Sequence, residues 1–275
     1  MVKTINFNGK IVDISTPIVM GILNITDDSF YDGGKYRNIN EALKQIKVML
    51  REGADIIDIG AQSTRPRAIQ LSVDEEISRL QQIIPIAKKE FPNAILSIDT
   101  FYGAVADKAL SMGADMINDI SGGDFDPTIF DIVAKYKCPY VLMHHKGTPS
   151  DMQINPQYQD VTLEVTDYFI QKIGELHQKG VYDIILDLGY GFGKTLEHNY
   201  TLLKNSAIFS KFNMPILTGI SRKSMVYKLF NTNSKEALNG TTALHMFALM
   251  NGSKILRVHD VKEAKEVITL YNQLS

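Results

Sequence analysis

Short runs of β-branched and other apolar residues alternate along the chain with longer segments in which apolar residues recur at the helical period. This alternation is typical of βα units built around a parallel sheet. Eight runs have the length and composition of strands, and eight strands close a (β/α)8 barrel. They are Ile18–Leu23, Ile56–Ile59, Ala94–Ile98, Met116–Asn118, Tyr140–Met143, Ile184–Leu186, Ile216–Leu217 and Ile255–Val258.

Two of the longer segments carry a single apolar stripe, as a helix that covers a parallel sheet must. The stripes are Ile39, Ala42, Leu43, Ile46, Met49 and Leu50, and Ile77, Leu80, Ile83, Ile84 and Ala87. The phrases GADIID, at 53–58, and GADMIN, at 113–118, each place a glycine where a helix would end and a strand would follow. They therefore indicate repeated units.

The remaining segments complete the predicted architecture. The sequence MVKTINFNGKIVDI alternates apolar and polar residues and predicts a hairpin that closes the bottom of the barrel. Thr26–Arg37 and Ala61–Leu71 lack an apolar pattern, and loops of this length in a compact barrel are expected to be mobile binding loops. We predict an α/β protein, a single (β/α)8 TIM barrel domain over residues 1–275, with a short N-terminal β-hairpin and two long mobile βα loops.

Composition narrows the possible partners. The 29 lysines and arginines nearly balance the 31 acidic residues, so the chain lacks the excess charge that would draw it to nucleic acid or an anionic membrane. A small-molecule partner is expected instead. Cys138 is the only cysteine, and the sequence contains neither a signal-peptide pattern nor a transmembrane run. These features favour a cytoplasmic location.

Polar residues stand at the end of every predicted strand, and in this fold the chemistry lies at the carboxyl ends of the strands. A single aspartate after a strand is commonly a helix N-cap, and both Asp99 and Asp119 could serve as one. Convergence of eight such ends on one rim is better explained by an active site. The residues are Asn24, Asp58, Asp99, Asn118, Asp119, His144, His145, Asp187, Ser221, Arg222, Lys223, Arg257 and His259.

Two motifs invite other interpretations. GYGFGKT, at 189–195, is similar to a phosphate loop, but a Walker motif needs glycine where Leu188 stands. We interpret it as a wall of the site, with Phe192 presenting a ring and Lys194 near solvent. Because adjacent residues on a strand point to opposite faces, His144 and His145 cannot both bind one metal ion. The sequence still allows a magnesium ion that is held partly by substrate phosphates.

At these strand ends the motifs resemble, in order and spacing, those of the dihydropteroate synthases. The motifs are MGILNITDDSFYDGG, GADIIDIGAQSTRP, SIDT, NDISGG, LMHHKGTP, GFGKT, GISRKS and RVHDV, and they run from about Met20 to Val261. The resemblance implies a transferase of folate biosynthesis. It would join 6-hydroxymethyl-7,8-dihydropterin diphosphate to p-aminobenzoate, forming 7,8-dihydropteroate and pyrophosphate. It also implies Mg2+ as cofactor, inhibition by sulfonamides and a homodimer.

The resemblance further implies a role for individual residues. Asp99, Lys223, Arg257 and His259 are the implied catalytic residues. The implied pterin-binding residues are Asp99, Asn118, Ile120, Met143, Asp187, Phe192 and Lys223. The implied diphosphate-binding residues are Asn24, Arg65, Arg257 and His259, with Asn24 also a metal ligand, and the p-aminobenzoate site comprises Thr64, Arg65, Pro66 and Ser221. A carboxylate such as Asp187 suits the adjacent ring N–H and amino groups of a pterin.

Alternatives remain at this stage. Lys223 beside Arg222 could act as a Schiff-base nucleophile, although a ring-binding lysine explains the surrounding carboxylates better. A pterin-dependent methyltransferase would share the barrel, but STRP and SRKS argue against it. A non-catalytic pterin-binding paralogue would be expected to lose the diphosphate residues.

Four positions depart from the family pattern, namely Asp27, Gln62, Arg67 and Leu188. Because of these four differences, the resemblance does not predict sulfonamide sensitivity or the motion of the loops.

Overall fold

The structure is a computed structural model of the chain, and it describes residues 3–7, 9–25, 35–62, 70–148, 152 and 154–274. The strands are β1 (Thr4–Phe7), β2 (Lys10–Asp13), β3 (Ile18–Asn24), β4 (Ile56–Gly60), β5 (Ile95–Asp99), β6 (Met116–Asp119), β7 (Tyr140–Met143), β8 (Ile184–Asp187), β9 (Ile216–Thr218) and β10 (Ile255–Val258). The α-helices are α1 (Lys35–Glu52), α2 (Val73–Glu90), α3 (Gly103–Ser111), α4 (Thr128–Tyr136), α5 (Val161–Gln178), α6 (Leu196–Lys204), α7 (Ser224–Tyr227), α8 (Leu238–Met250) and α9 (Val261–Leu274). Short 3₁₀ helices cover Ser206–Phe212, Lys228–Phe230 and Ser234–Glu236.

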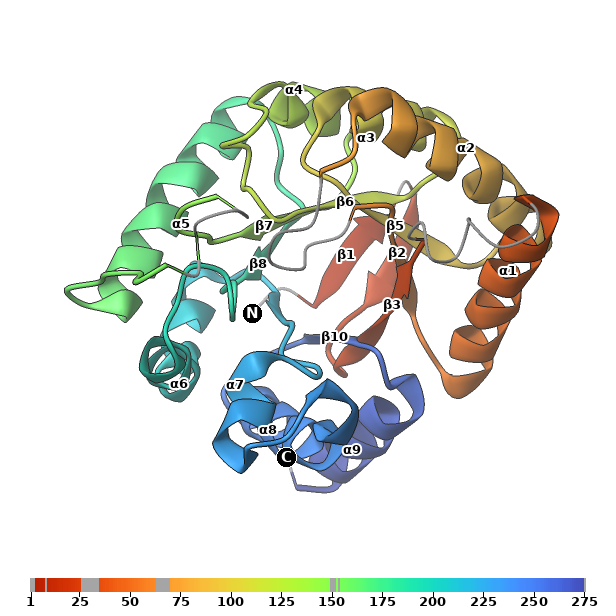
Figure 1. Ribbon diagram of the computed structural model, residues 1–275. Coiled ribbons are helices and arrows are strands. Elements are labelled where there is room, and N and C mark those ends of the chain that lie inside the picture. The colour runs from red at the N-terminus through yellow and green to blue at the C-terminus, as the bar shows by residue number, and fades with distance from the viewer. Residues whose placement is uncertain are drawn as a thin grey trace.

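Strands β3 to β10 form a closed barrel in which each strand pairs with its neighbours in chain order, and β10 pairs with β3. The barrel pairings are parallel, whereas β1 and β2 form a separate antiparallel hairpin. The helices surround the strands (Figure 1). The predicted (β/α)8 barrel and its N-terminal hairpin are thus confirmed. Within the described ranges, no helix combines the length and hydrophobicity that crossing a bilayer requires.

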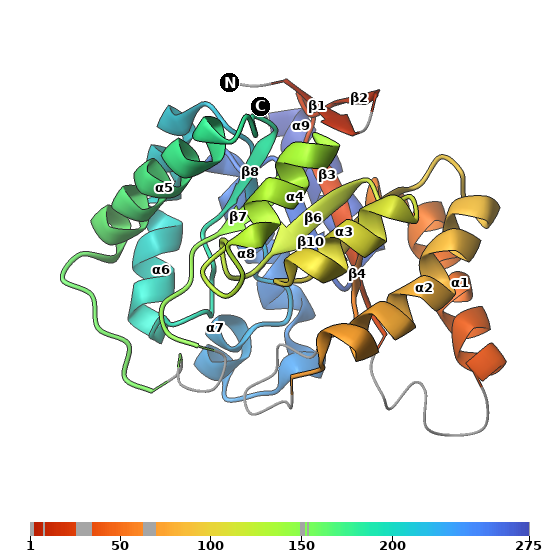
Figure 2. The ribbon, with the colours of Figure 1, turned by 90° about the horizontal axis from the view of Figure 1, so that it is seen from above.

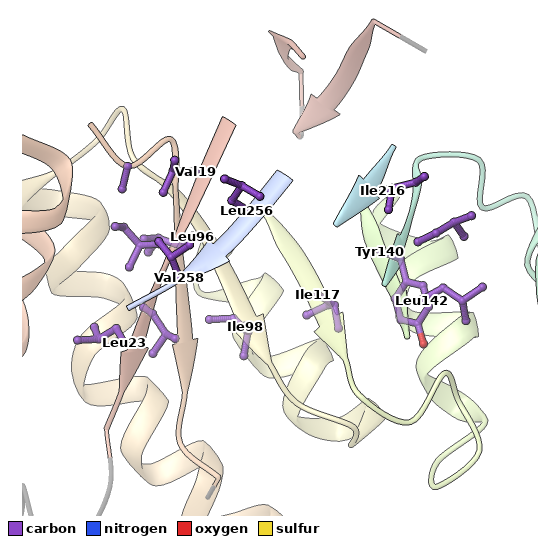
Figure 3. Packing of buried hydrophobic residues seen from close by; sticks show 14 of the residues in the cluster. Val19, Leu23, Leu96, Ile98, Ile117, Tyr140, Leu142, Ile216, Leu256 and Val258 are labelled. Atoms are coloured by element: carbon purple, nitrogen blue, oxygen red, sulfur yellow. The ribbon is translucent and has the colours of Figure 1, made fainter. Parts of the chain in front are cut away.

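The barrel strands have two different faces because successive side chains point to opposite sides. The outward-facing side chains, such as Val19, Leu96 and Leu142, pack under the surrounding helices (Figure 3). Inward-facing residues form a second apolar cluster in the lower barrel, which Ile5, Phe7 and Ile14 of the N-terminal segment cover. Figure 2 shows the hairpin at one end of the barrel. The hairpin therefore closes the bottom of the barrel, as the sequence predicted.

Two helix boundaries show how local sequence determines the elements. Helix α2 begins after Ser72, whose side chain accepts a hydrogen bond from the Glu75 backbone N–H while the Glu75 side chain accepts from Ser72. The prediction that Thr26–Arg37 is entirely loop was wrong at its end, because α1 begins at Lys35. No glycine or proline follows Gly34 before the apolar stripe, so nothing prevents the helix from starting early. Residues 26–34 and 63–69 lie outside the described residues.

The two Gly-Ala-Asp phrases form matching turns. Gly53 and Gly113 follow helices and have φ values of 100° and 104°, a left-handed conformation that glycine adopts without strain. Asp55 then accepts a hydrogen bond from the Val19 backbone N–H at 2.8 Å, and Asp115 accepts one from Leu96 at 2.7 Å. Each aspartate also pairs with a lysine of a neighbouring helix. The repeated phrase thus fastens each new strand to the strand before it.

We expect Asp115→Ala to destabilise the fold by about 1–3 kcal/mol, because it leaves the buried Leu96 N–H without an acceptor. Calorimetry should show a Tm lower by about 2 °C or more. Asp107→Ala is the control, since Asp107 pairs with Lys135 on the exposed surface and should leave the Tm unchanged. Equal effects of the two substitutions would contradict the assigned role of Asp115.

Candidate active site

Inward-facing polar residues replace the apolar ones toward the carboxyl ends of the strands. The register aligns Asn24 with Gly60, Gly60 with Asp99, and Asp99 with Asn118 across four neighbouring strands. One level lower, Asp58 on β4 aligns with Ser97 on β5. All these positions alternate with outward-facing apolar residues, so the pleat directs the polar side chains into the barrel mouth.

Arg257 on β10 connects two carboxylates inside this mouth. Its Nε and Nη2 lie 2.7 and 2.6 Å from Asp58 Oδ2, and Nη2 also lies 2.6 Å from Asp99 Oδ2. Asp58 additionally accepts a hydrogen bond of 3.0 Å from the side-chain amide of Asn118. The sequence placed Asp58 at a strand end but predicted no role for it. Its inward register relative to Ile56 was the signal that could have found it.

Burial shifts the pKa values of two of the predicted catalytic residues toward neutrality. Burial raises the pKa of Asp99 to about 7, although the Arg257 guanidinium opposes this rise. Burial also lowers the pKa of Lys223 to about 8, and here the attraction of Asp187 opposes the change. The mouth therefore contains an acid and a base whose charges depend on small changes near neutral pH.

Lys223 lies at the centre of a second group of contacts. Its Nζ donates a 2.5 Å hydrogen bond to the Tyr190 carbonyl and lies 4.6 Å from the centre of the Phe192 ring. Asp187 accepts a hydrogen bond from the Gly189 backbone N–H and electrostatically favours the charged form of Lys223. Arg222, in contrast, forms an ion pair with Asp260, at 2.7 Å. Burial, with a smaller contribution from the charge of Arg257, lowers the pKa of Lys223, whereas Arg222 is engaged with Asp260.

Three of the predicted ring-binding residues share one small apolar cluster. Ile120 and Met143 pack with Phe101, and Phe192 contacts the same cluster from the β8–α6 loop. This cluster is separate from the main core and from the lower barrel. It therefore places apolar surface at the mouth, beside the charged residues, although its contact with a pterin remains a prediction.

The predicted diphosphate residues Asn24, Arg257 and His259 lie at the same end of the barrel. His259 Nδ1 and the Ser221 hydroxyl are 3.1 Å apart, and the His259 backbone N–H also donates to that hydroxyl. Partial burial, together with the charge of Arg257, lowers the pKa of His259, so the imidazole is neutral near pH 7. Asn24 is exposed at the end of β3. The Ser221 hydroxyl is already engaged with His259, so p-aminobenzoate would have to share it.

Three of the strand-end residues do not join this group. Asp119 faces outward, where it accepts hydrogen bonds from Tyr140 Oη and from the backbone N–H groups of Ser121 and Gly123. Asp119 therefore organises the loop after β6, and it is not the N-cap of α4, which begins after Pro127. His144 lies 2.9 Å from Lys194, and His145 contacts Asp124. The expectation that all strand ends converge was therefore wrong for Asp119, which the strand period turns outward. His144 and His145 follow the end of β7 at Met143, and they pair with Lys194 and Asp124.

Lys194 is buried, and the prediction that it lies near solvent was wrong. Its Nζ contacts His144 Nδ1 and donates to the carbonyl oxygens of Gly189 and Phe192, at 2.9, 2.8 and 3.2 Å. Burial lowers its pKa well below the usual lysine value. The three glycines of this loop all have positive φ, which lets its carbonyls turn inward toward the Lys194 amine. Lys194 therefore fixes the loop that carries Phe192 and the Tyr190 carbonyl.

Of the two departures from the family pattern within the described residues, Gln62 bridges two segments through its side chain. Its amide accepts from the Leu71 backbone N–H and donates to the Leu71 carbonyl and to buried Glu76. Leu188 is buried in the core. Thr64, Arg65, Pro66, Asp27 and Arg67 lie outside the described residues. So do most of the two loops predicted to be mobile, and these predictions remain open.

A metal ion would find few protein ligands at this mouth. Among the described residues, no group of three or more His, Cys, Asp or Glu side chains could hold one. The exposed Asn24 offers one hard oxygen donor beside Gly60 and Asp99. Such a donor fits a magnesium ion that keeps most of its ligands from water and a diphosphate.

Comparison with known proteins gives a consistent result. The family model described as "Pterin binding enzyme" matches residues 20–259. A dihydropteroate synthase of Escherichia coli is 43% identical over 262 residues, which cover 94% of this chain and 92% of that protein. The solved Yersinia pestis dihydropteroate synthase with a sulfonamide drug complex is 38% identical, has a TM-score of 0.91, and covers 98% of each chain. The Xanthomonas albilineans enzyme with 4-aminobenzoic acid is 34% identical, with a TM-score of 0.92 and coverage of 100% and 98%.

We expect Lys194→Met to lower stability by about 1–3 kcal/mol, because it removes the shared donor of buried carbonyl groups. Thermal unfolding should report the loss, and fluorescence of a probe bound at the mouth should report weaker binding. Lys146→Met is the control, since Lys146 lies on the neighbouring loop but bonds to Gln157 and Glu164 at the surface. A Lys194 variant as stable as the control would contradict the fastening role.

Proposed function

The chain belongs to the pterin binding enzyme family, and from this premise we infer that it is a transferase with dihydropteroate synthase activity. The reaction joins 6-hydroxymethyl-7,8-dihydropterin diphosphate to p-aminobenzoate and releases pyrophosphate. The observation that carries this inference is the group of complementary charges at the barrel mouth, where Asp99 and Asp187 lie with Lys223 and Arg257. The relatives named above are synthases, so neither the methyltransferase nor the non-catalytic alternative has an observation in its favour.

The pterin end of the substrate suits Asp187 and Lys223. One carboxylate can accept the adjacent ring N–H and amino donors of a pterin, and a protonated lysine can donate to the ring carbonyl. Asp187 has one oxygen occupied by the Gly189 N–H, and no partner for the other is found among the described residues. Burial raises the pKa of Asp187, which increases its readiness to accept strong hydrogen bonds. Ile120, Met143 and Phe192 would enclose the flat ring.

The diphosphate end suits Arg257 and His259. Arg257 carries a permanent charge and offers bidentate donors, whereas His259 would donate a hydrogen bond as a neutral imidazole. Asn24 would provide a protein ligand for Mg2+, which supplies positive charge that stabilises the leaving pyrophosphate. Arg65 is proposed to bind the same group. Thr64, Arg65, Pro66 and Ser221 remain the proposed p-aminobenzoate residues.

The bond changes need no protein nucleophile. The C–O bond between the pterin methylene and the diphosphate breaks, and pyrophosphate leaves with the electron pair. The aromatic amine of p-aminobenzoate forms a C–N bond to that methylene and loses a proton. Positive charge that develops on the pterin would be stabilised by ionised Asp99, which lies inside the mouth and is paired with Arg257. Lys223 therefore acts as a donor to the ring and not as a Schiff-base nucleophile.

The oligomer is the next part of the proposal. Exposed apolar side chains gather on the chain that follows Lys223, at Leu229, Phe230, Phe247, Met250, Leu270 and Leu274. Helices α8 and α9 pack against one another and lie next to α7 (Figure 1). Exposed apolar groups mark a protein interface where they form a contiguous patch, and we propose that these side chains do so. They support a homodimer.

The single cysteine, buried and unpaired, supports a cytoplasmic location.

The direct test is pyrophosphate release by purified protein given both substrates and magnesium. Release should require both the pterin diphosphate and p-aminobenzoate, and sulfonamides should compete with p-aminobenzoate. Release that does not depend on p-aminobenzoate would contradict a synthase.

We expect Arg257→Met to weaken binding of the pterin diphosphate by about 2 kcal/mol or more, since the anion loses a buried charged partner. Binding of the same pterin without the diphosphate should change little. Calorimetry on the two ligands measures the difference. If both ligands weaken equally, Arg257 supports the structure of the mouth and does not bind the diphosphate selectively.

The pH dependence of kcat/KM for the pterin diphosphate should be bell-shaped. Below about pH 7 Asp99 gains a proton and loses its charge, and above about pH 8 Lys223 loses the proton it donates. Activity should therefore fall on both sides of the interval between these values. Asp99→Asn, as the matched variant, should lower activity and remove the acidic limb. A profile without an acidic limb in the wild type would contradict the role of ionised Asp99.

Sedimentation should show a dimer for the native protein. Met250→Lys places a charge on an exposed apolar residue of α8, so it should raise the dimer dissociation constant. Ile170→Lys, an exposed apolar position on α5, is the control and should leave the dimer intact. A native monomer, or equal sensitivity to both changes, would contradict this interface.

A further inference from the structure

Asp58 is the most completely buried carboxylate at the mouth. Its residue exposure is 0%, whereas the side chain of Asp99 retains 10%. One oxygen, Oδ2, accepts from Arg257 Nε and Nη2 and from the Asn118 amide. Among the described residues, Oδ1 has no hydrogen-bond partner. A buried carboxylate with no access to solvent depends on such partners for its stability.

Asp58 and Asp99 differ in whether a ligand can replace their contact with Arg257. They occupy its Nε and Nη2 groups, and no hydrogen bond from Nη1 is found within the described part of the chain. Asp99 is nearer to solvent and can exchange its partner for a ligand group. Asp58 lies one level deeper, opposite Ser97, and no solvent or ligand can replace Arg257 there without burying an unpaired charge. Asp58 is therefore the fixed contact of the guanidinium and Asp99 the exchangeable one.

Asp58 also determines how the Asn118 amide is oriented. A carboxylate can only accept, so the NH₂ end of Asn118 faces Asp58 at 3.0 Å. The carbonyl end of that amide is left for another donor. Asp58 thus orients both Asn118, which is proposed to bind the pterin, and Arg257, which is proposed to bind the diphosphate.

We propose that Asp58 is a positioning residue of the reaction, which holds Arg257 so that its free edge receives the diphosphate and which orients Asn118 for the pterin. This role rests on the proposed function. It places the structural support for leaving-group binding on β4, at a strand-end residue to which the sequence assigned no individual role. Asp58 touches neither substrate and acts through these two side chains.

The first experiment is a double-mutant cycle of Asp58→Asn and Arg257→Met, with steady-state kinetics and binding of magnesium pyrophosphate. Asp58→Asn alone should lower kcat and weaken pyrophosphate binding by about tenfold or more, while KM for p-aminobenzoate stays unchanged. In the Arg257→Met background the same change should alter pyrophosphate binding less than about twofold, because the group it positions is already absent. Additive effects would overturn the proposal.

Ser97→Ala is the matched control. Ser97 lies beside Asp58 in the register, is equally buried, and its hydroxyl has no hydrogen-bond partner among the described residues. Its removal should leave pyrophosphate binding unchanged. An effect as large as that of Asp58→Asn would show that any polar change at this level disturbs the mouth, and would overturn the specific role of Asp58.

The second experiment uses the native protein and does not depend on the folding of a variant. Hydrogen exchange of the Arg257 Nε–H, followed by NMR, should be slow both without and with magnesium pyrophosphate, because Asp58 keeps this hydrogen bond in both states. Fast exchange in the bound state would overturn the proposal. Wild-type pyrophosphate release from the two substrates is measured in parallel, so that failure of the synthase activity itself is distinguished from failure of the Asp58 role.

Discussion

The parallel pairing of β10 with β3 is the constraint on which the rest of the structure depends. It aligns Ile255 with Ile18 and Val258 with Gly21, and so joins the last strand of the barrel to the first. This closure removes the two open edges of the sheet. It also brings Arg257 to Asp58 and Asp99, which precede it by 199 and 158 positions. The ion pairs of the mouth therefore exist only in the closed barrel.

The interior of the closed barrel is apolar at the bottom and polar at the mouth. The pKa values of the mouth residues depend on this arrangement. The lower part of the barrel is filled by apolar side chains and covered by the hairpin, so water does not reach the polar layer from below. Burial consequently raises the pKa of Asp99 and lowers that of Lys223. In the free protein the charges satisfy one another. A substrate with matching donors and an anionic end can enter by exchanging partners with them, without leaving any charge unpaired.

The site residues are supported by contacts behind them. Lys194 holds the β8–α6 loop, whose Tyr190 carbonyl in turn receives Lys223, and the ion pair of Arg222 with Asp260 connects the loops after β9 and β10. Lys223 also precedes α7, so the proposed dimer surface begins directly after a residue proposed to bind the substrate. In this proposal, the stability of the mouth and the association of two chains are connected through the same short segment.

By itself, the sequence determined the barrel, the strand positions and most of the residues at the mouth, because a period of two and a helical stripe are local properties of the chain. The same period would have placed Asp58 inward and Asp119 outward. Tertiary structure alone decided the partners. The burial of Lys194, the sharing of Arg257 by two carboxylates and the engagement of Ser221 with His259 all join distant segments. The pKa shifts could not be predicted from the sequence either. They follow from burial, and burial depends on which elements cover a residue and not on its neighbours along the chain.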